Sequence, residues 1–169
     1  MELKGKFADA VNDQVTMELK AAMVYRQLSI EMDYRDLPGM ASWFLIQSGE
    51  ELGHAQRFTD HMTDREACPK IETIEAPGLT IKTPLDAFKA ALDNEQQVSE
   101  SIRNLYRMSQ EVGDIDSIPL LNWFINEQLE EESTVSEIIG RINLIGDDGD
   151  GLLRLDAELG ARKPEPGDG

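Results

Sequence analysis

The sequence predicts an all-α protein, a bundle of four long helices followed by one short C-terminal helix. Apolar residues recur at helical spacing along four long stretches, whereas the period-two alternation of strands is scarce outside residues 71–81. Proline, glycine and aspartate mark the breaks between these stretches. A chain of 169 residues suits a single domain built around one hydrophobic core.

The first two predicted helices are separated by a short break. The run from Asp36 to Gly39, which contains Pro38, interrupts the helical pattern and predicts a turn. The helix before it covers residues 6 to about 35, and its apolar positions are Phe7, Val11, Val15, Ala22, Leu28 and Met32. The helix after it covers residues 38–65, and its apolar positions include Trp43, Phe44, Ile46, Leu52, Phe58 and Met62.

The last three predicted helices follow a long crossover. Residues 68–83 contain prolines, a glycine and β-branched residues, which favours an extended segment. Thr83 as N-cap, Pro84 at the first helical position and Asp86 as a partner for the cap then predict a helix that ends near residue 112. A fourth helix is predicted over residues 117–145. A short fifth one carries Leu152, Leu153, Leu155 and Leu159.

The lengths of the links predict how these helices are connected. Short links after the first and third helices, and a long one after the second, give two helical hairpins joined by a crossover. Helices of about 28 residues would each be about 40 Å long. The polar tail over residues 163–169 is rich in proline and glycine and is expected to be disordered, so the predicted domain covers residues 1–162.

Composition limits the possible function classes. The formal net charge is −17, which opposes binding to the phosphate backbone of nucleic acids and favours attraction of cations. The single cysteine, Cys68, excludes an intrachain disulfide framework and fits a reducing compartment. The first residues contain no apolar signal segment, and no apolar run is long enough to span a bilayer, so we expect a cytoplasmic protein that does not bind membranes.

Glutamates from four helices are expected to meet at one level of the bundle. Residues that face each other in an antiparallel hairpin lie equally far from its turn. The midpoint between Glu18 and Glu51 falls in the first predicted turn, and the midpoint between Glu95 and Glu131 falls in the second. His54 and Gln128 each lie three residues, about one helical turn, from one of these acids.

The surroundings of these glutamates indicate a metal site. None of the residues three or four positions from them, which share their helix faces, is lysine or arginine. Converging buried carboxylates without a cation are unfavourable unless they take up protons or bind metal. Oxygen ligands with one imidazole suit iron, manganese or zinc. The alternative is that each glutamate lies on a solvated outer face.

Two strings in the sequence resemble those of bacterial non-haem ferritins, members of the ferritin-like di-iron superfamily. Residues 50–54, EELGH, resemble the E-E-x-x-H motif of bacterial ferritins. Residues 123–132, WFINEQLEEE, resemble the fourth-helix motif W-F/Y-x-x-E-Q-x-E-E-E. Glu18, Tyr25 and Glu95 also match, and the resemblance extends from residue 5 to about residue 160. It implies the ferritin-like four-helix bundle with its long crossover between helices two and three.

The resemblance also implies which residues bind iron. One iron would be held by Glu18, Glu51 and His54, and a second by the bridging Glu51 with Glu95 and Glu131, with Gln128 close by. A third site nearer the storage cavity would use Glu50, Glu127, Glu130 and the shared Glu131. In ferritins the residue that matches Tyr25 hydrogen-bonds near the metals and can supply an electron. From the sequence alone, a plain core tyrosine is the competing interpretation.

Departures from related families limit this assignment. Bacterioferritins have histidine as the last ligand of the fourth helix and a haem-binding methionine, whereas Glu131 and Leu52 stand at the corresponding positions here. We therefore expect no haem. Ferritin-like oxygenases carry E-x-x-H twice, but here Gln128 and Glu131 replace the second pair. The two iron sites should consequently be unequal, as suits a centre that releases its oxidised iron.

The resemblance implies an iron storage protein with ferroxidase activity. It would oxidise Fe(II) to Fe(III) with O2 or H2O2 and store the product as mineral inside a hollow homo-oligomeric shell of 24 subunits. One alternative is a permanent di-iron oxidase or peroxidase of the rubrerythrin kind, although the chain lacks a C-x-x-C module. A second is a non-enzymatic acidic helical-bundle protein, and a weaker third is a DNA-protecting mini-ferritin, which the negative charge opposes.

Two further polar features are not expected to take part in the metal site. His61 follows His54 by seven residues, and we expect it at a surface or facing a cavity. The acidic run from Asp147 to Gly151 superficially suggests a calcium loop. It lacks the alternating ligands and terminal glutamate of an EF-hand, so a turn that links two helices is favoured.

Overall fold

The computed structural model describes residues 2–164, and the regular structure within them is entirely helical. The five helices are α1 (Gly5–Asp33), α2 (Pro38–Thr63), α3 (Pro84–Val112), α4 (Ile118–Ile145) and α5 (Gly149–Gly160). This confirms the predicted all-α class and the order of elements. The extended crossover forms no strand in the described part of the chain. The disorder expected for the tail falls mainly on residues 165–169, outside the described residues.

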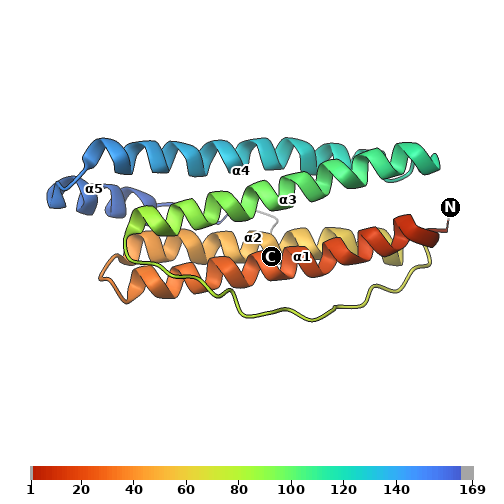
Figure 1. The fold of residues 1–169 in the computed structure, drawn as a ribbon, viewed down its shortest axis with the longest axis horizontal. Helices are drawn as coiled ribbons and strands as arrows, with labels where there is room; N and C mark the ends of the chain where they lie inside the picture. The colour runs from red at the N-terminus through yellow and green to blue at the C-terminus, as the bar shows by residue number, and fades with distance from the viewer. Residues whose placement is uncertain (1, 165–169) are drawn as a thin grey trace.

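The long helices form two hairpins, α1 with α2 and α3 with α4 (Figure 1). The crossover runs along the outside of α1 from one end of the bundle to the other (Figure 1). The Asn12 side chain holds it there. Its amide nitrogen donates to the Lys70 carbonyl oxygen at 3.1 Å, and its oxygen accepts from the Lys70 backbone N–H at 2.6 Å. The crossover therefore connects α2 to the far end of the bundle, where α3 starts.

Side-chain and glycine caps define several helix ends. The Thr83 side chain accepts from the Asp86 N–H while the Asp86 carboxylate accepts from the Thr83 N–H, which is the capping box predicted from the sequence. Gly113 ends α3 with a φ of 71°, a left-handed conformation that favours glycine. Asp148 caps α5 by accepting from the Asp150 N–H. The acidic run after α4 is thus a helix-linking turn, as predicted.

The hydrophobic core is divided into two clusters. One lies toward α5 and includes Tyr25, Phe44 and Val135. The other lies toward the link between α3 and α4 and includes Phe58 and Phe124. Along α1 to α4, the glutamates Glu18, Glu51, Glu95 and Glu131 fall between residues of the two clusters. These four glutamates form an acid layer that crosses the bundle near its middle.

The outer surface carries some large apolar side chains. Met23 and Ile30, seven residues apart on α1, are 40% and 53% exposed, and Leu45 and Leu52, seven apart on α2, are 44% and 46% exposed. Residues seven apart lie on nearly the same helix face. Neither these helices nor any other in residues 2–164 combine the length and apolar content needed to cross a bilayer.

Candidate metal centre

Three side chains at the level of the acid layer are close enough to one another to hold one metal ion. One ligand atom each from Glu18, Glu51 and His54 can be chosen so that all lie within 4.8 Å of one another. The three residues are 0%, 1% and 3% exposed. Glu51 and His54 lie one turn apart on α2, with 3.2 Å between the Glu51 Oε2 and His54 Nδ1 atoms. The predicted first set of ligands is brought together.

Glu95 and Glu131 extend this group across the bundle. Tyr25, fully buried on α1, donates its hydroxyl hydrogen to Glu95. The amide nitrogen of Gln128 donates to the Glu95 carboxylate at 3.0 Å. Electrostatic repulsion from both Glu95 and Glu131 acts on Glu51. The four helices therefore converge at one level, as the register predicted, and Tyr25 touches an acid of the site in addition to filling the core.

Buried oxygen atoms without a hydrogen-bond donor fit a site for a cation. Glu18 Oε2, Glu51 Oε1 and Gln128 Oε1 are each inaccessible to solvent and have no hydrogen-bond partner. A buried unsatisfied oxygen is unfavourable by about 1–3 kcal/mol. The Gln128 oxygen and any ionised carboxylate oxygen can only accept, so a hydrogen-bond donor, including a proton on a neighbouring carboxyl, or a metal cation would satisfy them. The donor set of this layer, oxygens and one imidazole, fits a borderline metal such as iron.

Burial shifts the pKa of each carboxyl in the layer upward. The pKa of Glu18 lies well above its usual value because of desolvation first and the neighbouring Glu51 second. Desolvation and repulsion from Glu95 and Glu131 do the same to the pKa of Glu51. The pKa of Glu131 is raised to about 8, chiefly by desolvation and by Glu95. Without a cation Glu131 therefore holds a proton at neutral pH, and the raised pKa values of Glu18 and Glu51 favour their protonated forms, so metal binding would release protons.

Glu95 experiences opposing influences. Desolvation raises its pKa, and the hydrogen bonds from Tyr25 and Gln128 lower it. Desolvation is the larger effect, so the pKa of Glu95 rises overall. For the phenol of Tyr25, desolvation and the adjacent Glu95 raise the pKa well above the usual value. Tyr25 therefore stays protonated and remains a hydrogen-bond donor to Glu95.

The acids expected at a third iron site are less closely gathered. Glu50 is buried, Glu127 is half-buried and Glu130 is exposed on α4. Within residues 2–164, Glu18, Glu51 and His54 are the one group of three or more potential ligands with ligand atoms all within 4.8 Å. Neither the predicted second set, Glu51 with Glu95 and Glu131, nor the predicted third set converges to that degree. Glu50 instead forms an ion pair with Arg162.

Several polar residues support the layer although the sequence did not identify them as functional. Gln14 donates to Glu18 at 2.8 Å, and Gln47 donates to Glu131 at 2.8 Å. Each lies four residues from a predicted ligand on its own helix, so helical spacing could have found both. Ser99 accepts from Gln128 at 3.3 Å and donates to Glu132. Arg162 lies far away in sequence, and no local signal pointed to it.

His61 lies at another place in the bundle. Its Nε2 atom is 2.8 Å from the Ser117 hydroxyl and 3.3 Å from the guanidinium of Arg65. Arg65 in turn forms two hydrogen bonds to the Asp114 carboxylate, at 3.0 and 2.6 Å. Desolvation and Arg65 lower the pKa of His61. His61 is thus a half-buried member of a cluster near the α3–α4 link, separate from the acid layer.

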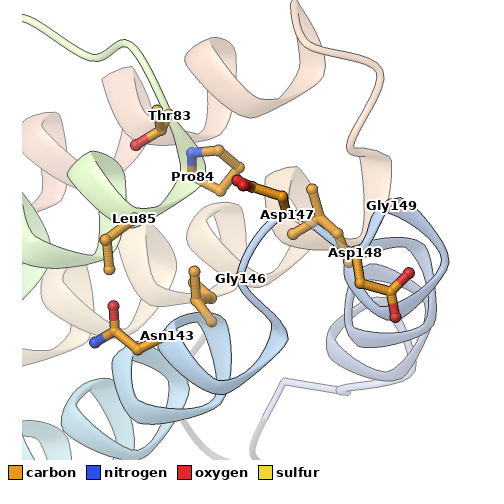
Figure 2. Close-up of a pocket in the computed structure, with 10 residues that line it drawn as sticks. Thr83, Pro84, Leu85, Asn143, Gly146, Asp147, Asp148 and Gly149 are labelled. Carbon is orange, nitrogen blue, oxygen red and sulfur yellow. The ribbon is translucent and has the colours of Figure 1, made fainter.

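A cavity of about 410 Å³ lies at the opposite end of α3 from that link. It is lined by the start of α3 at Thr83, Pro84 and Leu85 and by the turn after α4 at Gly146 and Asp147 (Figure 2). Glu95 lies eleven residues further along α3, which corresponds to about 16 Å of helix. This cavity is therefore separate from the candidate metal centre.

Comparisons with known proteins agree with this architecture. The family model described as a ferritin-like domain matches residues 8–145. The chain is 34% identical over 160 residues to the bacterial non-heme ferritin of Staphylococcus aureus strain COL, covering 95% of this chain and 96% of that protein. It is 36% identical over 154 residues to the bacterial non-heme ferritin of Staphylococcus haemolyticus, covering 91% and 93%.

Solved structures show the same fold. An open pore ferritin from the archaeon Archaeoglobus fulgidus superposes with a TM-score of 0.93 at 31% identity, covering 96% of this chain and 100% of that one. A humanized archaeal ferritin superposes with a TM-score of 0.95 at 31% identity, covering 98% and 100%. The similarity thus includes α5 as well as the four long helices.

Proposed function

This chain belongs to the ferritin family, and from that premise we propose that residues 1–162 form a di-iron domain that oxidises Fe(II) and stores the Fe(III) product. Family and fold support iron storage and ferroxidase activity in general terms. The observation that carries the proposal for this chain is the buried layer of four glutamates, which contains donor-less oxygens and the close group of Glu18, Glu51 and His54.

Two Fe(II) ions are the substrates of this layer. Glu18, Glu51 and His54 would bind the first ion, and the bridging Glu51 with Glu95 and Glu131 would bind the second. Each ion loses one electron. The pair together reduces O2 to H2O2, or H2O2 to two molecules of water, with uptake of two protons in either case. Binding both ions side by side favours two-electron reduction over release of a one-electron radical.

The residues around the ligands have distinct roles in this scheme. Gln14 and Gln47 orient Glu18 and Glu131 through their amide hydrogens, which fixes the direction of the ligand oxygens. Gln128 holds Glu95 and leaves its own oxygen directed at no donor. Tyr25 donates to Glu95 and, as the ferritin resemblance implies, can supply an electron during oxidation.

The two iron sites are unequal, and this favours release of the product. The first has an imidazole ligand and the second has only oxygen ligands with a neutral amide nearby. Fe(III) would hydrolyse and move toward the storage cavity, with Glu50, Glu127 and Glu130 as a third site on the way. Because Glu130 is exposed and Glu50 is paired with Arg162, this third site should bind metal more weakly than the other two.

A homo-oligomeric shell of 24 subunits in the cytoplasm completes the proposal. The exposed apolar side chains of α1 and α2, at Met23, Ile30, Leu45 and Leu52, support contact with a second copy. Leu52 stands where bacterioferritins carry the haem-binding methionine, so the centre works without haem. O2 or H2O2 serves as the oxidant.

The first two alternatives differ in measurable ways. A rubrerythrin-like di-iron oxidase would retain its metal through many turnovers and would need a separate reductant. A non-enzymatic acidic bundle would keep its glutamates solvated, whereas Glu18, Glu51, Glu95 and Glu131 are all at most 7% exposed. The burial of these four side chains favours the ferroxidase over the non-enzymatic protein.

The test is rapid mixing of the metal-free protein with Fe(II) in the presence of O2, followed by measurement of particle size. The wild-type protein should oxidise two Fe(II) ions per subunit in a fast phase and should form large particles that retain iron. Glu51→Ala should slow this phase by at least about tenfold, because both iron sites lose a ligand. Assembly should persist, since removal of a carboxylate relieves repulsion in the metal-free protein.

Glu111→Ala is the matched control. Glu111 is an exposed glutamate near the end of α3, so this variant removes the same charge away from the acid layer. Its oxidation kinetics should equal those of the wild type. Normal fast-phase kinetics in Glu51→Ala would refute the assignment of the site. Iron that stays bound at two ions per subunit after many turnovers would favour the rubrerythrin-like alternative.

A further inference from the structure

Helix α5 is fixed against the start of α2. The Asp156 carboxylate, 6% exposed, accepts the backbone N–H groups of Gly39 at 3.1 Å and Met40 at 2.7 Å. An acid at the N-terminus of a helix satisfies free N–H groups and complements the helix dipole. Gly39 allows the close approach, because a Cβ atom there would lie 1.8 Å from the Asp156 carbonyl oxygen. The position of α5 relative to α2 is therefore closely defined.

This docking delivers Arg162 to the acid layer. Arg162 follows the end of α5 by two residues, and its Nη2 atom donates to both Glu50 carboxylate oxygens, at 2.9 and 2.7 Å. Its Nη1 atom donates to the side-chain oxygen of Gln47, and its guanidinium carbon lies 5.0 Å from the centre of the Trp43 ring. Trp43, Gln47 and Glu50 lie at successive turns along one stripe of α2.

The guanidinium is also linked to the dinuclear site through one side chain. Gln47 accepts from Arg162 and donates to Glu131 at 2.8 Å. Glu50 is adjacent in sequence to Glu51, and it adds to the repulsion that acts on the Glu51 and Glu131 carboxyls. Arg162 thus places a permanent positive charge beside the buried acid of the expected third site.

We propose that Arg162 is a displaceable counter-cation that competes with metal for Glu50. This inference rests on the proposed function, since it assumes that metal fills the acid layer. In the metal-free protein Arg162 neutralises Glu50. The guanidinium opposes a divalent ion at the Glu50 oxygens, because it donates to both of them and the two cations repel each other, so withdrawal of Arg162 strengthens metal binding there. Occupancy of the third site is therefore coupled to the position of the C-terminal segment after α5.

Zinc titration of the assembled, metal-free protein followed by calorimetry tests this competition. Zn(II) is redox-inert, so binding is measured apart from oxidation. The wild type should show two tight binding events per subunit and a weaker third. Arg162→Gln should tighten the third event at least tenfold and leave the first two unchanged. Arg162→Lys keeps the charge without the forked contact, so it should fall between the wild type and Arg162→Gln.

Lys163→Gln is the matched control, because it removes one positive charge from the neighbouring exposed residue. Its titration should match the wild type. Glu50→Gln added to Arg162→Gln should abolish the gain in affinity, which locates the gain at Glu50. An unchanged or weakened third event in Arg162→Gln, or a gain that survives Glu50→Gln, would overturn the proposal.

Tryptophan fluorescence supplies a second measurement. Its third-equivalent signal should not change if the ion pair between Arg162 and Glu50 stays in place. Arg162 lies over Trp43, so its withdrawal should alter the emission when the third equivalent of Zn(II) binds. The same equivalent should cause no such change in Arg162→Gln. Identical third-equivalent spectra in the two proteins would contradict displacement. Loss of the first two events in the wild type would instead count against the proposed function, so the two failures are distinguishable.

Discussion

Two buried charged regions of this bundle shift the pKa values of their carboxyl groups in opposite directions. Near the α3–α4 link, the Asp114 carboxylate receives two hydrogen bonds from Arg65 and a third from the Ser117 N–H. Burial acts to raise the pKa of Asp114, but these donors outweigh it and the net shift is downward. In the acid layer, burial dominates, and the pKa values of Glu18, Glu51 and Glu131 rise.

The difference separates a structural ion pair from a candidate cation site. Arg65 and Asp114 are 7% and 8% exposed, and each supplies the other's charge, so this cluster is complete within the chain. The acid layer contains more carboxylate oxygens than donors, as the unpartnered Glu18 and Glu51 oxygens show. Burial alone therefore does not indicate a metal site, whereas burial without a counter-charge points to a candidate one.

The largest expected effect on stability comes from breaking the buried ion pair between Arg65 and Asp114. Arg65→Ala should destabilise the protein by about 3–5 kcal/mol, because it leaves the Asp114 carboxylate buried and unpaired. Thermal or denaturant unfolding measures the loss. Arg107→Ala is the control, since Arg107 pairs with Glu100 at an exposed site and should change stability by at most about 1 kcal/mol. Equal effects of the two substitutions would contradict the contrast between buried and exposed pairs.

Changing pH should affect the acid layer in the neutral range. In the folded protein Glu131 keeps its proton up to about pH 8, whereas its ordinary pKa is 4.5. The folded state binds more protons across this window, so the stability of the metal-free protein should fall as pH rises through it, by about 2–4 kcal/mol.

Melting temperatures of metal-free protein between pH 5 and pH 8.5 measure this dependence. Glu131→Gln should reduce it, because the amide does not titrate, while Glu18, Glu51 and Glu95 still contribute. Asp114 acts in the opposite direction at lower pH, since its pKa is lowered from 3.8 and its stabilisation is lost only under acid conditions. A stability that rises steadily from pH 5 to pH 8.5 would contradict the proposed protonation of the layer.

Added metal should stabilise the protein by binding at the acid layer and not at the Arg65–Asp114 cluster. Zn(II) at about one hundred times its dissociation constant should stabilise the folded protein by about 2.7 kcal/mol per site. Glu51→Ala should lose most of this gain. Arg65→Ala should keep it, although its baseline stability is lower. An equal metal response in all three proteins would show that zinc binds elsewhere.

The smallest effect is expected at the exposed acid Glu130. Glu130→Ala should change stability by less than about 0.5 kcal/mol, because the side chain lies in solvent. The initial fast oxidation of Fe(II) should remain. The ratio of iron oxidised to O2 consumed, or the later rate of mineral formation, should change if Glu130 belongs to a third site. Wild-type values for all of these quantities would remove Glu130 from the proposed pathway.

Much of the fold could be predicted from the sequence because helices follow local rules. The Thr83–Asp86 capping box and the breaks at Pro38 and Gly113 placed helix ends close to where the structure has them. The level of Glu18 and Glu51 followed from their equal distance to a short turn. The absence of lysine and arginine on their faces then indicated buried acids without a cation, and the burial of both agrees with this.

The sequence could not predict contacts made by segments that lack a short-range pattern. The Arg162 guanidinium reaches Glu50 from beyond the end of α5, and no spacing along a single helix could predict that ion pair. Nor did the sequence indicate the contacts of Glu132, which accepts from Ser99 on α3 and lies 3.6 Å from Arg103. Both contacts depend on how separate helices pack, which helical periodicity does not encode.

By itself the sequence determined the helices, their connectivity and the types of ligand atom available, because caps, breaks and spacing act over a few residues. Only the tertiary structure decided which carboxylates have a protein counter-charge. Asp156 fixes α5 on α2 and thereby carries Arg162 to Glu50, while Glu18 and Glu51 keep oxygens without donors. Electrostatic balance depends on distances between groups remote in the chain, and those distances exist only once the helices have packed.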